Sequence, residues 1–271
     1  MNMNTQWIIV TDLDGTLINH HDYSVDRAIP FISELKKRDI PVIFNTSKTF
    51  HESIALQKQL NINDPFIVEN GSCIYYPKDL YKKQPKNTID KNTHWAEIIG
   101  NKQSDIRIIL DSITIPKTNY KLLSECSISE AVELTGLTSQ QAKLAITREF
   151  SEPFIWTSGE SEFIDFKQQI EKSNLSMLQG GRFQHIIGKC DKGIATQKLL
   201  ANYNTKNKTI ILGDSANDAA MLNIADISII VNSPSNSQLE KLINADFKTV
   251  NEAPQGWADG IRKALLKIDN I

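Results

Sequence analysis

Short apolar runs alternate with helical patterns near the N-terminus, and this alternation constrains the fold more than any other feature of the chain. Residues 7–11, 41–45 and 66–68 are the apolar runs, and each is typical of a buried strand. Residues 26–38 and 49–60, which lie between them, carry apolar side chains at helical spacing. This β-α-β-α-β order predicts a parallel sheet with right-handed crossover connections.

The pattern changes near residue 77, where a segment rich in Lys, Pro and Asn begins. We expect residues 77–93 to form a loop or linker. The segment after it mixes helical patterns with short strands, which indicates an α+β insertion, and the alternation of strands and helices then resumes. The sequence therefore predicts a doubly wound, Rossmann-like α/β core built from residues 1–82 and 188–271, with a second α+β domain inserted at 83–187.

The composition is that of an ordinary globular protein, with 40% hydrophobic residues and a net charge of -2. This balance argues against a nucleic-acid-binding surface. The three cysteines are far apart, which argues against a disulfide framework or a zinc site and is typical of the reducing cytosol. We find no signal peptide and no apolar run long enough to span a membrane, so we expect a cytoplasmic protein without a membrane partner.

Two carboxylates follow directly after the first predicted strand, in the segment Asp12-Leu13-Asp14-Gly15-Thr16. In open α/β sheets, ligands bind at the carboxyl ends of the strands. Two neighbouring carboxylates repel each other, and a divalent cation relieves that repulsion. The pair suits a nucleophile and an acid/base partner that act on an anionic substrate with the help of magnesium. The alternative is an Asp-Gly turn with solvated charges.

Three further polar sites stand at a predicted strand end or helix start. Thr46 and Ser47 follow the second strand, where a hydroxyl can donate to a phosphate or cap the next helix. Lys192 opens a helix against the macrodipole preference, so it can hold a phosphate charge or be a surface lysine. Asp214 and Asp218 follow a later strand, where they can complete an oxygen-ligand shell for Mg²⁺ or cap a helix.

These four segments, with Asn217 between the last two carboxylates, resemble the four motifs of the haloacid dehalogenase superfamily of phosphatases. The resemblance implies that Asp12 is the nucleophile that forms an aspartyl-phosphate, and that Asp14 is the general acid and then the general base. It implies that Thr46 and Lys192 orient and balance the transferring phosphoryl group. The implied cofactor is Mg²⁺, and its implied ligands are Asp12, Asp14 through the main-chain carbonyl, Asp214 and Asp218.

The insertion resembles the C2-type cap of the Cof-like branch of that superfamily, and Glu69-Asn70-Gly71 matches a loop typical of the branch. Residues 147–154 and 180–185 are similar to mannosyl-3-phosphoglycerate phosphatases. This resemblance implies hydrolysis of a small phosphorylated glycoside, mannosyl- or glucosyl-3-phosphoglycerate, to mannosylglycerate or glucosylglycerate. The implied substrate-binding residues are Ser47, Lys48, Glu69, Asn70, Arg148, Glu149, Ser151, Gly181, Arg182, His185 and Asn217.

Among these residues, Arg148 and Arg182 can fork onto a carboxylate, while Glu149, Ser151 and His185 can bond sugar hydroxyls. The alternative is that Arg148 and Glu149 form ion pairs on the protein surface. Two other functions stay open: another Cof-like sugar phosphatase, acting on a hexose phosphate or sucrose phosphate, and a sugar-phosphate-binding protein without catalysis. A P-loop kinase is disfavoured, because the sequence has no GxxxxGK[ST] motif.

Overall fold

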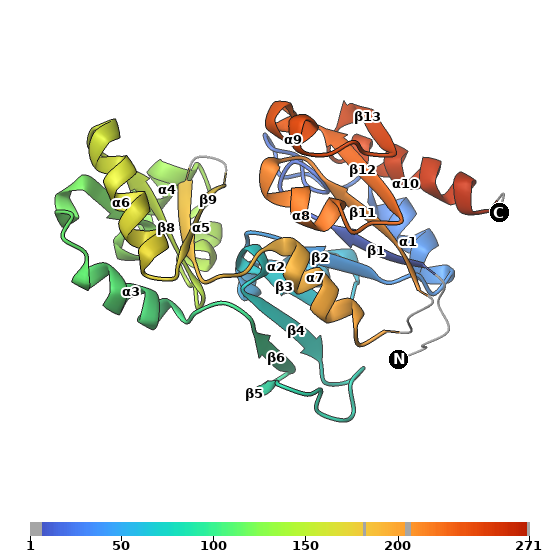
Figure 1. Cartoon of the computed structure of the whole chain (residues 1–271). Coiled ribbons are helices and arrows are strands. Elements are labelled where there is room, and N and C mark those ends of the chain that lie inside the picture. Colours follow the sequence, from blue (N-terminus) through green and yellow to red (C-terminus); the bar gives the residue numbers. More distant parts are fainter. Residues whose placement is uncertain (1–6, 181–182, 204–206, 270–271) are drawn as a thin grey trace.

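The computed structural model describes residues 7–180, 183–203 and 207–269, and it arranges them around two sheets (Figure 1). The larger sheet has nine strands in the order β13-β12-β11-β1-β2-β3-β4-β6-β5. Its strands are β1 (Trp7–Thr11), β2 (Val42–Asn45), β3 (Phe66–Val68), β4 (Cys73–Pro77), β5 (Ile89–Lys91), β6 (His94–Ile98), β11 (Lys208–Gly213), β12 (Ile227–Asn232) and β13 (Phe247–Glu252). The smaller sheet has four strands in the order β7-β8-β10-β9. They are β7 (Tyr120–Leu122), β8 (Ser151–Trp156), β9 (Ser176–Gly180) and β10 (Phe183–Ile187).

The larger sheet is parallel from β13 to β3 and antiparallel beyond β3. The chain first winds outward from β1 to β3 and later from β11 to β13, so the strand order reverses between β1 and β11. In a doubly wound sheet, this switch point opens a crevice at the carboxyl ends of the two strands. The predicted doubly wound α/β core is therefore confirmed, although its sheet is mixed rather than wholly parallel.

Helices cover both faces of this sheet because side chains along each central strand alternate between two hydrophobic cores. In β1, Ile9 packs with helices α1, α2 and α10, whereas Ile8 and Val10 pack with α7, α8 and α9 on the other face. Those helices are α1 (Ile29–Lys37), α2 (Phe50–Leu60), α7 (Lys192–Leu200), α8 (Ala219–Leu222), α9 (Asn236–Leu242) and α10 (Gln255–Asp269). The central strands are therefore buried on both sides, which fixes their carboxyl ends rigidly.

The larger sheet continues further along the chain than the sequence indicates. We expected a linker over residues 77–93 and an insertion from residue 83, but β6 pairs with β4 and β5 pairs with β6. The expected boundary was wrong because β5, at the edge of the sheet, is largely exposed and carries a polar composition. An exposed edge strand and a linker have similar compositions, so sequence alone does not separate them.

The segment between β6 and the end of β10, residues 99–187, is called the cap below. Its helices are α3 (Gln103–Ser112), α4 (Ile128–Thr135), α5 (Ser139–Ala145) and α6 (Glu160–Lys172). Its small sheet packs α3 and α6 around an aromatic core that includes Phe154 and Phe166. In Figure 1 the cap lies beside the carboxyl ends of the central strands of the larger sheet. Within the described ranges, none of the helices is long and apolar enough to cross a membrane.

Candidate active site

Asp12 stands directly after β1, at the switch point of the larger sheet. Its Oδ1 accepts a hydrogen bond of 2.6 Å from Nζ of Lys192, the first residue of α7. The other side of that ammonium contacts Asp218 Oδ1 at 2.7 Å. Lys192 is almost fully buried, and burial alone would lower its pKa, but the two carboxylates outweigh burial and raise the pKa. Lys192 is therefore a buried cation shared by two buried anions, and not a surface lysine.

Asp214 and Asp218 are carried by the loop that follows β11. Asp218 Oδ2 accepts hydrogen bonds from the main-chain N–H groups of Asp214 (2.9 Å) and Ser215 (3.0 Å), which closes the loop onto itself. Thr16 donates its hydroxyl to Asp214 Oδ1 at 3.1 Å and so connects this loop to the segment after β1. A backbone turn at Gly15, whose φ is 82°, makes this approach possible.

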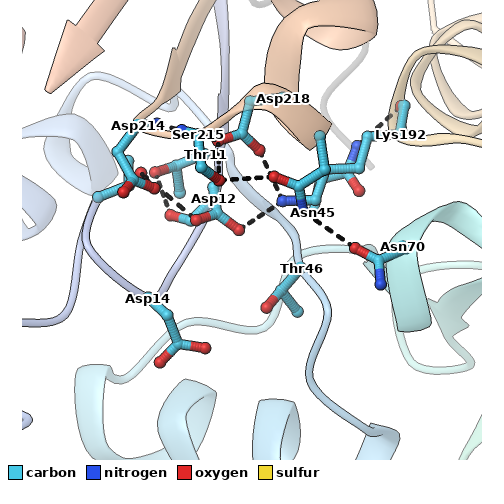
Figure 2. A network of polar contacts seen from close by, with 12 residues as sticks. Thr11, Asp12, Asp14, Asn45, Thr46, Asn70, Lys192, Asp214, Ser215 and Asp218 are labelled. Carbon is cyan, nitrogen blue, oxygen red and sulfur yellow. Dashed lines mark hydrogen bonds and ion pairs between the residues drawn. The ribbon is translucent and has the colours of Figure 1, made fainter. Parts of the chain in front are cut away.

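The carboxylates of Asp12, Asp214 and Asp218 converge, as Figure 2 shows, with one oxygen of each within 4.8 Å of the others. Burial raises the pKa of Asp12 well above its usual value, and the neighbouring carboxylates add to this rise. Asp214 Oδ2 is buried and has no hydrogen-bond partner among the described residues, although Nε2 of His20 lies 3.5 Å away. Three converging buried carboxylates, of which only Asp12 and Asp218 contact the Lys192 ammonium, are suited to a hard divalent cation.

The end of β2 is attached to the start of α7. The Asn45 amide donates to the Lys192 carbonyl at 2.8 Å and to Thr196 Oγ1 at 2.9 Å. Thr46 follows and is fully buried, and its hydroxyl accepts a hydrogen bond from the N–H of Lys48. Figure 2 shows the Thr46 side chain below the acidic cluster and to the right of Asp14. The end of the second strand therefore places the Thr46 hydroxyl at the same edge of the sheet as the carboxylates that follow the first strand.

Asp14 lies apart from the acidic cluster (Figure 2) and is about one-third exposed. Its Oδ1 pairs with the Lys48 ammonium at 2.9 Å, and the same ammonium lies 3.6 Å from Glu52. Burial alone would lower the pKa of Lys48, but Asp14 and Glu52 raise it above its usual range. Lys48 is therefore a charged group at the site, held between two carboxylates.

A cleft of ≈ 290 Å³ opens between the core and the cap above these residues. Eight of the predicted site residues line it: Asp12, Asp14, Ser47, Lys48, Arg148, His185, Asp214 and Asn217. Thr46, Lys192 and Asp218 are buried beside it. The cap side of the wall combines the polar groups of Arg148 and His185 with apolar residues such as Phe183. The cleft can therefore hold an anionic group at the acidic cluster, through a cation, and a larger polar molecule beneath the cap.

The structure directs four of the predicted substrate-binding side chains elsewhere. The Glu69 carboxylate accepts hydrogen bonds from the main-chain N–H groups of Glu149 and Phe150 and from the hydroxyl of Ser151. The side chains of Glu69 and Ser151 are therefore hydrogen-bonded to each other. The Glu149 carboxylate turns away from the cleft, to Lys91 and Tyr75.

The Asn70 side-chain oxygen accepts a hydrogen bond from Asn217 Nδ2 at 3.1 Å, and Asn70 does not line the cleft. None of these four residues lines the cleft, and a pattern of polar residues does not give side-chain direction. Their direct contact with substrate stays a prediction. The expected roles of Gly181 and Arg182 fall outside the described residues.

Three site residues were not singled out by the sequence. Thr16 bonds Asp214, Asn45 fixes the start of α7, and His20 lines the cleft next to Asp214. The neighbouring Asp214 carboxylate raises the pKa of His20 above its usual value. Thr16 and Asn45 belong to the strand-end segments already noted, so their positions in the sequence could have predicted a role in the site. His20 lies in a polar loop, and nothing in the sequence pattern distinguishes it.

Comparison with known proteins is consistent with this geometry. A family model described as haloacid dehalogenase-like hydrolase matches residues 9–253. The chain is 37% identical over 276 residues to the glucosyl-3-phosphoglycerate/mannosyl-3-phosphoglycerate phosphatase of Persephonella marina, covering 97% of this chain and 98% of that protein. It is 36% identical over 270 residues to the protein of the same name from Methanococcoides burtonii, covering 97% and 99%. A solved haloacid dehalogenase-like hydrolase from B. subtilis shares the fold, with a TM-score of 0.68, 17% identity and coverage of 94% and 98%.

Proposed function

Because the chain belongs to the haloacid dehalogenase-like hydrolase family, we propose that it removes phosphate from glucosyl-3-phosphoglycerate and mannosyl-3-phosphoglycerate. Two relatives that match almost the whole chain carry the name of this activity. The observation that carries the proposal is one cleft that holds Asp12 against the buried cation Lys192 and also presents Lys48 and Arg148. A phosphate and a separate carboxylate on one substrate need these two kinds of cationic contact.

In the proposed reaction, Asp12 attacks the phosphorus and forms an aspartyl-phosphate, and the glycerate oxygen leaves. The ammonium of Lys192, 2.6 Å from Asp12, balances the charge that gathers on the transferring phosphoryl oxygens. Thr46 and Asn217 orient the phosphoryl group. Asp14 gives its proton to the leaving oxygen and then accepts one from the water that hydrolyses the aspartyl-phosphate. Its position at the mouth of the cleft, apart from the acidic cluster, supports this separate role.

The proposed cofactor is Mg²⁺, held by Asp12, Asp214 and the main-chain carbonyl of Asp14, with Asp218 in support. The unpartnered Asp214 oxygen and the excess of carboxylates over ammonium groups support this assignment. The bound cation supplies positive charge that offsets the repulsion between the carboxylates and the phosphate. Hard oxygen ligands favour Mg²⁺ over softer metals.

We propose that the cap determines the substrate and that the core performs the chemistry. Arg148, and also Arg182 on the sequence resemblance, read the glycerate carboxylate, while His185 and Ser47 contact hydroxyl groups. In this account Lys48 contributes charge to the same carboxylate. Phe183 and Pro153 line the cleft, and in this account they shield the reacting centre from water.

A phosphatase screen with purified protein and Mg²⁺ tests the proposal. The panel contains glucosyl- and mannosyl-3-phosphoglycerate, hexose phosphates and sucrose phosphate, and Asp12→Asn serves as the control for contaminating activity. The account predicts that kcat/KM for the two glycosyl phosphoglycerates exceeds that for the sugar phosphates by at least about tenfold, which one charge-assisted contact provides. Equal or higher kcat/KM for a sugar phosphate without a carboxylate would contradict the proposed substrate.

A further inference from the structure

The turn Glu69-Asn70-Gly71 joins the segments that carry the catalytic residues. The N–H of Glu69 donates to the carbonyl of Lys48 at 3.0 Å, and the N–H of Asn70 donates to that of Thr46 at 2.9 Å. Gly71 packs so closely on the main chain before Lys192 that a Cβ there would lie 2.1 Å from a carbonyl oxygen. The turn therefore has a fixed position relative to the strand ends of the active site.

The conformation of this turn is unusual for its residue types. Glu69 and Asn70 have φ values of 50° and 59°, a left-handed region that is uncommon for a side chain such as Glu. This backbone directs the Glu69 carboxylate out of the larger sheet and toward the cap. A residue held in such a conformation requires compensating contacts around it.

The Glu69 carboxylate makes its contacts with one short segment of the cap. Glu69 Oε1 accepts the N–H of Glu149 at 3.0 Å, and Oε2 accepts the N–H of Phe150 at 3.2 Å and the hydroxyl of Ser151 at 2.6 Å. The side chain of Glu69 is 2% exposed. Both carboxylate oxygens are therefore engaged, and neither is available to a ligand. One buried anion of the core therefore binds residues 149–151, in addition to the Glu149 contacts with Lys91 and Tyr75.

The residue before that segment is Arg148, which lines the cleft. Its Nη1 donates to Ser151 Oγ at 3.0 Å and to the carbonyl of Ser47 at 3.1 Å, and it lies 3.7 Å from Glu69 Oε2. Nε of Arg148 is buried and has no hydrogen-bond partner among the described residues. The contacts with Glu69 and Ser151 therefore orient the guanidinium but leave its Nε without a hydrogen-bond partner.

We infer that Glu69 is a positioning residue for substrate selection: it attaches residues 149–151 of the cap to the core and so holds the Arg148 guanidinium where it binds a substrate carboxylate. This inference rests on the proposed function for the identity of that carboxylate. In this inference Glu69 does not contact the substrate but acts on substrate binding by positioning Arg148. The Glu69 carboxylate then connects substrate selection by the cap to the strand ends that carry the chemistry.

A double-mutant cycle tests the inference, with Glu69→Gln, Arg148→Ala and the double variant. The measured quantity is a selectivity ratio, kcat/KM for glucosyl-3-phosphoglycerate divided by kcat/KM for p-nitrophenyl phosphate, which has no carboxylate. Gln places an N–H₂ group against donors and loses at least one of the three hydrogen bonds. We expect Glu69→Gln to lower the ratio about ten- to a hundredfold, mainly through KM for the glycosyl substrate. The double variant should have the ratio of Arg148→Ala alone, because one contact is lost only once.

Two controls separate this role from a structural one. Glu97→Gln changes another buried carboxylate, in β6 of the larger sheet and hydrogen-bonded to Tyr76, and should leave the ratio unchanged. Ser151→Ala, a milder change if Glu69→Gln does not fold, should lower the ratio in the same direction. Equal losses on both substrates, or losses that multiply in the double variant, would overturn the inference.

Amide hydrogen exchange gives a readout that needs no substrate. Glu69→Gln should speed exchange at the N–H groups of Glu149 and Phe150, because Glu69 accepts both, and unchanged exchange would overturn the inference. If the wild type hydrolyses p-nitrophenyl phosphate but neither glycosyl ester, the proposed function fails instead. The cycle is then measured with 3-phosphoglycerate as a competitive inhibitor, where a tenfold weaker inhibition constant in Glu69→Gln supports the inference and an unchanged one overturns it.

Discussion

Lys192→Met should destabilise the protein strongly, because it removes the one ammonium between two buried carboxylates. The side chains of Lys192, Asp12 and Asp218 are 1%, 7% and 0% exposed, and the two ion pairs measure 2.6 and 2.7 Å. Water therefore cannot replace the lost counter-charge. Breaking a buried pair by removing one partner costs about 3–5 kcal/mol, most of it from the charge left behind. We expect a loss in that range at pH 7.5.

The cause of this loss can be separated from simple loss of packing. Met fills a volume similar to that of the lysine stem, so the main change is electrostatic. Adding Asp218→Asn to Lys192→Met removes one orphaned charge and should recover about 1–2 kcal/mol. Without Lys192, protonation of Asp12 becomes more favourable in the folded state. The loss should therefore shrink as the pH falls from 7.5 to 5.

Urea unfolding followed by circular dichroism, in EDTA, measures these differences. Lys198→Met is the matched control, because Lys198 lies on the same helix α7 but is 48% exposed and pairs with Glu97 only at 3.7 Å. That control should change the free energy of unfolding by less than about 0.5 kcal/mol. A loss below about 1 kcal/mol for Lys192→Met would refute the assignment of a buried ion triad. So would a double variant less stable than Lys192→Met alone.

Further predictions concern catalysis, the metal and pH. Asp12→Asn should lower the rate of phosphate release by orders of magnitude, because an amide is a poor nucleophile, and should leave the circular dichroism spectrum unchanged. A rate above a tenth of the wild-type rate would contradict this. Removal of metal by EDTA should abolish turnover and added Mg²⁺ should restore it, whereas full activity in EDTA would exclude the metal. Arg182→Ala should lower kcat/KM for the glycosyl phosphoglycerates about ten- to a thousandfold but should change kcat/KM for p-nitrophenyl phosphate little. Equal losses on both substrates would exclude a carboxylate contact. Burial raises the pKa of Asp64 to about 6, so its protonated form stabilises the fold at low pH and that contribution is lost as the pH rises through 6. Asp64→Asn should therefore gain about 1–2 kcal/mol over wild type in urea unfolding at pH 7.5 and almost nothing at pH 4, and a constant difference would contradict the raised pKa.

The sequence predicted the strand ends of the active site because there the local and the global signals agree. Each of β1, β2 and β11 is an apolar run followed at once by polar residues, and parallel strands bring such positions to one edge. Asp12 and Asp214 are far apart in the chain, yet the doubly wound topology alone places them together. The same argument extends to Lys192, since its helix packs directly behind β1.

Features that depend on side-chain direction or long-range pairing were not predicted. The left-handed backbone at Glu69 sends its carboxylate to the cap, and no periodicity encodes this. Ser151 lies in β8 only two residues before Pro153, which lines the cleft, but Ser151 is used by Glu69 and Arg148. The pairing of β5 with β6 at the sheet edge leaves its polar residues exposed, so their composition matched a linker.

The most direct test of the account is the formation of phosphate bound covalently to Asp12. The enzyme is mixed with Mg²⁺ and with glucosyl-3-phosphoglycerate whose phosphate is radiolabelled, quenched in acid within milliseconds, and digested for peptide mapping. The account predicts that label appears on the peptide that contains Asp12, at a rate no slower than turnover, and that Asp12→Asn carries none. Turnover without labelled protein, or label on any other residue, would contradict the central claim.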